Sequence, residues 1–137
     1  MTSCNYVSPI EELENLLKIE LTKKDVSFID KQEQWIGPDG YKIETFNVIN
    51  SDCLSNKKHE MLQYDSVFVE NRYKTSEIYK YVKNTAGYYM ESNQENTKER
   101  LFYDTINNKL YYYLIRLIYY NQNFLFHLLL YPSIYLL

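Results

Sequence analysis

The Tyr-rich stretch from Arg100 to Leu117 limits the fold more than any other part of the sequence. Tyr, Leu and Ile dominate it on both sides of Asn107-Asn108, and these residue types favour strands. Because Asn accepts the left-handed backbone of tight turns, we predict a β-hairpin with a two-residue connection at Asn107-Asn108. The predicted cross-strand pairs are Tyr103 with Tyr112 and Leu101 with Leu114. A chain with this element is expected to build an antiparallel sheet.

Two further segments extend this hairpin into a larger layout. Residues 88–91 predict a strand, which a loop at 93–97 joins to the hairpin in a three-strand meander. Residues 9–21 carry apolar side chains at helical spacing and predict an amphipathic helix, with Ser8 as its N-cap and Pro9 in its first position. The predicted fold class is therefore α+β, with an N-terminal helix packed on an antiparallel sheet that ends in a C-terminal three-strand meander.

A second hairpin is predicted earlier in the chain. Strand-forming residues at 26–30, 35–36 and 41–49 surround the sequence Gly37-Pro-Asp-Gly40. Pro fixes a turn-compatible backbone, Asp bonds its neighbouring backbone and Gly accepts positive φ, so these four residues predict the turn.

The middle of the chain has a weaker pattern. Residues 51–62 predict a short helix that Ser51 or Asp52 caps. Residues 67–69 are compatible with a strand, and residues 76–83 fit either one face of a helix or an alternating strand. Both alternatives for 76–83 remain open at this level.

Length and composition predict one α+β domain over residues 1–137. A chain of 137 residues buries roughly two-thirds of its unfolded surface, so it needs no metal or disulfide framework. The net charge of −3 divides into 13 acids and seven bases in residues 1–70, and five acids and eight bases in residues 71–137. Since no clustered basic footprint is present, we expect no nucleic-acid binding.

Patterns for catalysis and metal binding are weak. His59-Glu60 begins like a zinc-protease helix, but position 63 is Gln where a second His is required, and the three glycines form no nucleotide-binding loop. Cys4 and Cys53 match no metal-ligand pair, and a bridge between them or lipidation at Cys4 is left open. We therefore predict a protein that is not an enzyme, with no catalytic residue, no cofactor and no metal.

Three motifs occur together in an order that suggests a family: Trp35-Ile-Gly-Pro-Asp-Gly-Tyr41, Ala86-Gly-Tyr-Tyr-Met-Glu91 and Phe102-Tyr-Asp-Thr-Ile-Asn-Asn-Lys-Leu-Tyr-Tyr-Tyr113. Together with the helix before them, they resemble a group of small, uncharacterised lipoprotein-like or membrane-anchored proteins of low-GC Gram-positive bacteria. That group has a Gly-Asp-Gly turn, a Gly-Tyr-Tyr-Tyr strand and a terminal Tyr-Asp-Thr…Leu-Tyr-Tyr-Tyr hairpin. The resemblance covers residues 10–118 and implies the layout above but no activity. It implies the cell envelope if an N-terminal anchor has been trimmed, and otherwise we expect a cytoplasmic protein.

The candidate binding residues lie in the two hairpins. The acids Asp30, Glu33, Asp39 and Glu44 form either a solvated acidic edge or, less simply, a cation site. Tyr111 and Tyr113 point to one side of the last strand, and Tyr112 and Leu114 point to the other, so one set is expected to face the N-terminal helix and the other solvent or the tail. Tyr gives a large contact area with a polar tip, which suits either sheet packing or binding.

These observations favour a small non-enzymatic protein-binding module. In one version of this function, the protein is an immunity-like protein that binds a secreted toxin. Its candidate partner-binding residues are Asp39, Glu44, Tyr111 and Tyr113. The alternative is an accessory or structural protein of the cell envelope. Residues 121–137 form an apolar tail that is too short and too polar at its start to span a bilayer. That tail packs on the domain, meets another chain, lies on a membrane surface, or is a non-native extension.

Overall fold

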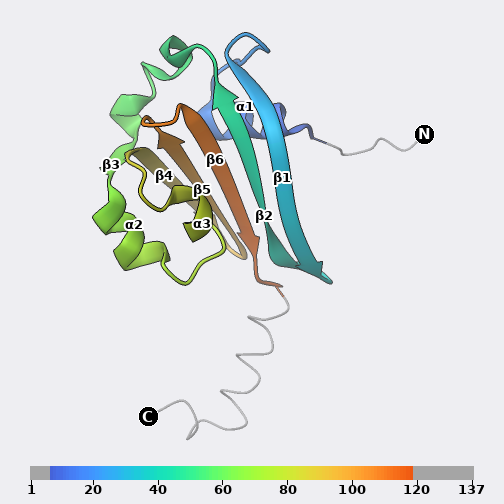
Figure 1. Cartoon of the computed structure of the whole chain (residues 1–137). Helices are drawn as coiled ribbons and strands as arrows, with labels where there is room; N and C mark the ends of the chain where they lie inside the picture. Colours follow the sequence, from blue (N-terminus) through green and yellow to red (C-terminus); the bar gives the residue numbers. More distant parts are fainter. Residues whose placement is uncertain (1–6, 119–137) are drawn as a thin grey trace, which may run out of the picture.

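The structure, a computed structural model, describes residues 7–118 and has an α+β fold (Figure 1). Its six strands form one antiparallel sheet in the order β1-β2-β6-β5-β4-β3. The strands are β1 (Val26–Ile36), β2 (Asp39–Val48), β3 (Leu62–Tyr64), β4 (Gly87–Gln94), β5 (Thr97–Asp104) and β6 (Lys109–Arg116). The helices are α1 (Pro9–Leu17), α2 (Ser66–Tyr73) and α3 (Tyr79–Val82), with 3-10 turns η1 (Ser51–Leu54) and η2 (Lys58–Glu60). The α+β class and the C-terminal meander β4-β5-β6 are confirmed.

Helix α1 begins as predicted and ends early. The Ser8 side chain accepts a hydrogen bond from the backbone N–H of Glu11 at 3.2 Å, and Pro9 starts the helix. The helix ends at Leu17 because Lys18 adopts the left-handed conformation, with φ of 58°. Leu21 lies beyond this end but is still buried in the same core as the helix.

The first hairpin turns on two residues instead of the predicted four. Ile36 pairs with Asp39, so the connection is Gly37-Pro38, and Gly40 lies inside strand β2. Gly40 has φ of 151°, and a Cβ at this position would lie 2.1 Å from the carbonyl oxygen of Gln34. The second glycine of the motif therefore allows the two strands to approach closely rather than to turn.

The terminal hairpin exists, but its predicted register is wrong by two residues. Tyr103 pairs with Leu110 and Leu101 pairs with Tyr112, because the loop has four residues, 105–108. The buried Asp104 side chain sets this loop: its Oδ1 accepts hydrogen bonds from the backbone N–H groups of Ile106 and Asn107 at 3.0 and 3.2 Å. A shift of two residues leaves each side chain on its predicted face of the sheet.

The middle segment differs most from expectation. The helix predicted at 51–62 is replaced by η1 and η2, and Asn50 rather than Ser51 or Asp52 caps η1. The strand considered at 67–69 is part of α2, which Asp65 caps. For residues 76–83 the helical alternative is confirmed over 79–82.

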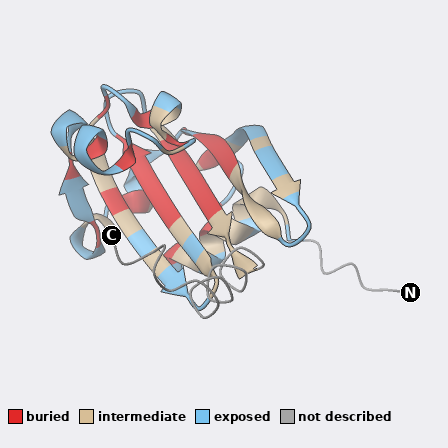
Figure 2. Ribbon diagram, turned by 90° about the horizontal axis from the view of Figure 1, so that it is seen from below, coloured by how far each residue is buried: buried red, intermediate tan, exposed pale blue. Residues whose placement is uncertain are grey.

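Helices cover both faces of the sheet. One hydrophobic core joins Leu13 and Leu17 of α1 to the sheet, and a second joins Val69 and Tyr73 of α2 and Val82 of α3 to the opposite face. Figure 2 shows buried residues running along the central strands between these layers. The face that was expected to meet solvent or the tail is instead covered by α2 and α3.

Some predictions fall outside the described residues. These concern Cys4 with its bridge or lipidation, and the tail at 121–137. Within residues 7–118, no helix combines the length and apolar character needed to cross a membrane.

Candidate functional site

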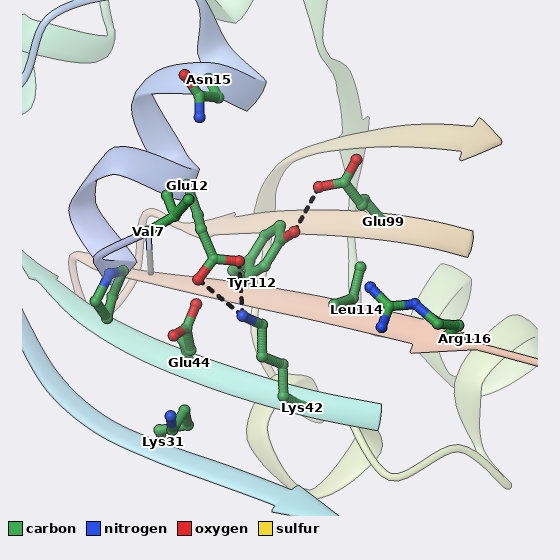
Figure 3. Close-up of a pocket in the computed structure, with 11 residues that line it drawn as sticks. Val7, Glu12, Asn15, Lys31, Lys42, Glu44, Glu99, Tyr112, Leu114 and Arg116 are labelled. Atoms are coloured by element: carbon green, nitrogen blue, oxygen red, sulfur yellow. Dashed lines mark hydrogen bonds and ion pairs between the residues drawn. The ribbon is translucent and has the colours of Figure 1, made fainter. Parts of the chain in front are cut away.

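A charged pocket lies between helix α1 and the strands β1, β2, β5 and β6 of the sheet (Figure 3). We call it the α1 pocket; its volume is about 460 Å³. Three acids and three bases line it together with apolar side chains and Tyr112. The charged lining residues are Glu12, Glu44, Glu99, Lys31, Lys42 and Arg116.

The strand register brings these residues together. Glu44 on β2 lies directly across from Lys31 on β1 and from Tyr112 on β6. One step further along the same face, Lys42 lies across from Glu33 and Leu114. Helix α1 adds Glu12 from above, as Figure 3 shows. The pocket floor is therefore built from neighbouring cross-strand rows of an antiparallel sheet.

Most of the charged groups have partners inside or beside the pocket. The Lys42 ammonium lies 2.7 Å from both carboxylate oxygens of Glu12, and only about a sixth of either side chain is exposed. Lys31 forms an ion pair with Glu33 on its own strand, with 3.6 Å between Nζ and Oε1. These two contacts occupy both lysines that flank Glu44.

The remaining charged groups contact aromatic side chains. The Arg116 guanidinium lies 5.6 Å from the centre of the Trp35 ring, a cation–π contact. The Tyr112 hydroxyl donates a hydrogen bond to a Glu99 carboxylate oxygen. Burial and this hydrogen bond raise the pKa of Tyr112, so its hydroxyl remains a proton donor.

Glu44 is the exception in this group. Only 1% of the residue is exposed, and among the described residues its Oε1 atom has no hydrogen-bond partner. The pKa of Glu44 is raised to about 7. Burial is the largest cause, and the nearby Glu12 carboxylate is the next, while Lys42 and Lys31 lower the pKa. A buried carboxylate oxygen without a donor destabilises the folded state, so Oε1 of Glu44 requires either a proton on the carboxyl group or a cationic donor.

The four predicted partner-binding residues do not form one surface. Asp39 and Glu44 are five positions apart on β2, roughly 17 Å along an extended strand, and their side chains leave opposite faces. Asp39 is half-buried and lines a different pocket of about 330 Å³, together with Tyr41 and Glu77. Only Glu44 belongs to the α1 pocket.

The prediction that Tyr111 and Tyr113 contact a partner is corrected by their position in the fold. Both are buried in the second core, under α2 and α3, with 6% and 2% of each residue exposed. The Tyr113 hydroxyl donates to Glu77 at 2.6 Å, and the Tyr111 ring packs on Tyr81 with 5.8 Å between ring centres. In this arrangement they support the packing of the helices, and they offer no exposed surface to a partner.

Sequence reasoning missed Glu12, Lys42, Glu99 and Tyr112 as pocket residues. One usable signal was present in strand β2. Its inward positions 42, 44, 46 and 48 are Lys, Glu, Phe and Val, which places two charges on a face that also carries core residues. Charges at inward positions of a strand indicate a polar pocket or buried pair.

Other reactive groups in residues 7–118 are dispersed. No group of three or more His, Cys, Asp and Glu side chains in this range could hold a metal ion, so the four acids of the first hairpin form no such site. His59 is exposed. Burial and nearby Asp25 raise the pKa of the half-buried Cys53 thiol to about 11, which disfavours the nucleophilic thiolate.

Comparison of the chain with protein-family models, curated proteins and solved structures gives no match.

Proposed function

We propose that this protein is a non-enzymatic binding module that recognises a protein partner through the β1–β2 hairpin. The observation that supports this proposal is the outer edge of β1. This 11-residue strand ends the sheet and pairs only with β2 within the described residues. An edge strand presents unpaired N–H and C=O groups to which an extended segment of another protein can add.

Exposed apolar side chains lie along the same strand. Phe28, Ile29 and Ile36 are all exposed, and Ile36 is 78% exposed. Apolar side chains beside an open strand edge supply contact area for the side chains of an added strand. Since both sheet faces are covered by helices, this edge is the part of the sheet best suited to recognition.

The same strand has features that limit indiscriminate pairing. Ile29 has no partner on β2 and forms a β-bulge, and the charged residues Asp30, Lys31 and Glu33 follow it. Bulges and charges are common protections against edge-to-edge aggregation. A partner must therefore match this charge pattern, which gives the edge selectivity. Asp39, at the far end of the hairpin, belongs to this surface in the proposal.

Site-specific photocrosslinking in the native host tests this proposal. A photoreactive phenylalanine analogue is introduced at Ile29 and, in a second variant, at Ile36. Ile106 is the matched control, because it is an exposed isoleucine (63%) in the β5–β6 loop. We expect both β1 variants to crosslink to the same protein, and the Ile106 variant not to. No adduct from either β1 position, or the same adduct from Ile106, would overturn the proposal.

The envelope-associated alternative stays a prediction from the resemblance, and no contact in residues 7–118 adds support to it.

A further inference from the structure

Glu44 is a buried carboxylate that points from β2 toward α1 at the α1 pocket (Figure 3). Its Oε1 atom has no hydrogen-bond partner among the described residues. Buried polar atoms in folded proteins are nearly always bonded, so an exception that borders a pocket suggests a site for a donor from outside the chain.

The neighbouring cations do not meet this need. Lys42 is held by Glu12 at 2.7 Å, and Lys31 is paired with Glu33. Arg116 is held over the Trp35 ring. The chain thus places three bases around the pocket, and each has another contact.

The charge balance favours an incoming cation. With Glu33 included as the partner of Lys31, the acids are Glu12, Glu33, Glu44 and Glu99, and the bases are Lys31, Lys42 and Arg116. Four acids against three bases leave one net negative charge when Glu44 is ionised. A charged donor bonds a carboxylate about twice as strongly as a neutral one.

We propose that the α1 pocket binds the end of a lysine or arginine side chain that a protein partner presents, with its N–H groups bonded to the Glu44 carboxylate. This inference rests on the proposed function and names the chemistry of the partner at a second point of contact. Lys31 lies on the edge strand and also lines the pocket, so one partner segment can reach both.

The shape of the pocket suits a long, unbranched arm. Glu44 is recessed at the base of the pocket, where Leu114 and Tyr112 of the floor lie beside it, and Val7 adds a further apolar lining residue. The methylene stems of Lys and Arg pack on such surfaces while their charged ends extend further. A volume of about 460 Å³ leaves room for either side chain beside Lys42.

A proton competes with the cation for Glu44. The groups that face it are Glu12 from α1, Lys31 from β1, Lys42 from β2, Glu99 from β5, and Tyr112 and Arg116 from β6. Burial raises the pKa of Glu44 to about 7, so the site is mostly ionised at pH 8 and protonated at pH 5. Binding is expected to weaken by roughly a hundredfold between these two pH values.

The test is an NMR titration of the ¹⁵N-labelled full chain with small probes. The probes are n-butylammonium and n-butylguanidinium, which mimic the two side chains, and n-butanol as the uncharged control. We expect the cations to shift the backbone amide signals of Lys31, Glu44 and Tyr112 and to bind at least about tenfold more tightly than butanol. Equal shifts with butanol would overturn the inference.

Two variants test whether the Glu44 carboxylate itself binds the cation. Glu44→Gln keeps the shape and is expected to lose about tenfold or more in affinity, whereas Glu95→Gln, in the exposed β4–β5 turn, is expected to bind like the wild type. Unchanged binding by Glu44→Gln overturns the inference. If that variant does not fold, the pH dependence of the wild type decides, and equal binding at pH 5 and pH 8 overturns it.

The peptide pair identifies the source of the cation. A capped Gly-Lys-Gly peptide is expected to bind as tightly as butylammonium or more tightly, and the same peptide with norleucine is expected not to bind. Tighter binding of the free amine than of the lysine peptide would overturn the assignment to a protein side chain. These outcomes are measured independently of the crosslinking at β1, so a failure of this inference can be distinguished from a failure of the proposed function.

Discussion

The Glu44→Gln variant is expected to remove a pH dependence from the free energy of unfolding. In the folded protein, burial and then Glu12 raise the pKa of the Glu44 carboxyl from 4.5 to about 7. The folded state therefore holds this proton more tightly than the unfolded chain, and the wild type is stabilised below the unfolded pKa. This stabilisation is lost as the pH rises from about 4.5 through about 7.

The size of the effect follows from the two pKa values. A change from 4.5 to about 7 corresponds to about 3 kcal/mol of unfolding free energy. Below about pH 4.5 the variant and the wild type should differ only by a constant that reflects the swap of a carboxyl for an amide. At about pH 8 the variant should have gained about 3 kcal/mol relative to the wild type.

Urea unfolding at about pH 4.5, 6 and 8, followed by circular dichroism, measures this difference. Carboxylates that do not interact with Glu44 cancel when the two free energies are subtracted, so the difference reports on Glu44 together with its neighbour Glu12. Glu95→Gln makes the same change at an exposed carboxylate in the β4–β5 turn and is the control for the substitution itself. A difference between Glu44→Gln and the wild type that is flat with pH would refute the reasoning, because it would mean that folding does not perturb the Glu44 proton.

Substitutions at Gly40, Asp104 and Tyr64, two of them with a matched comparison variant, test the fold. Gly40→Ala should lower the unfolding free energy by about 3 kcal/mol or more, because the new Cβ would lie 2.1 Å from a backbone oxygen. Gly37→Ala has open space around the new Cβ but a φ of 62°, so it should cost only about 1 kcal/mol. Thermal unfolding measures both variants. Asp104→Ala should cost about 3 kcal/mol by urea unfolding, since the turn loses both backbone bonds, and Asp104→Asn should recover part of this. Tyr64→Phe breaks a buried 2.8 Å bond to Thr85 and should lower the unfolding free energy by about 1 kcal/mol; an unchanged melting temperature would contradict it.

The regular parts of the fold could be predicted because local signals agreed with the tertiary structure. The Ser8 cap and the apolar spacing of α1 describe a helix that forms as expected, up to the left-handed Lys18. Strand-forming residues on both sides of Asn107-Asn108 likewise identify the terminal hairpin. Its register could not be predicted from the Asn residues alone, because the buried Asp104 selects a four-residue loop.

The middle segment and the pocket depend on contacts that lie far apart in the sequence. Residues 67–69 have strand-forming side chains, but an Asp65 cap and packing on the second core favour a helix. Glu44 was selected as part of an acidic edge, yet it is buried at a pocket that residues of α1, β1, β2, β5 and β6 line together. The sequence shows that position 44 is charged, but the spacing of residues does not show which other elements cover that side chain.

The β-bulge at Ile29 connects the edge of the sheet to the α1 pocket. Phe28 faces Phe46 in the first core, with 5.6 Å between ring centres, and the extra residue then reverses the alternation of β1. As a result Lys31 and Trp35 lie on the same face as Glu44, where Trp35 holds Arg116. If Ile29 were instead paired in a regular ladder with no bulge, Lys31 and Trp35 would turn to the α2–α3 face, and Arg116 would lose its aromatic contact. One unpaired isoleucine thus both protects the open edge and completes the charged pocket, which explains how the two proposed contact points come to share one hairpin.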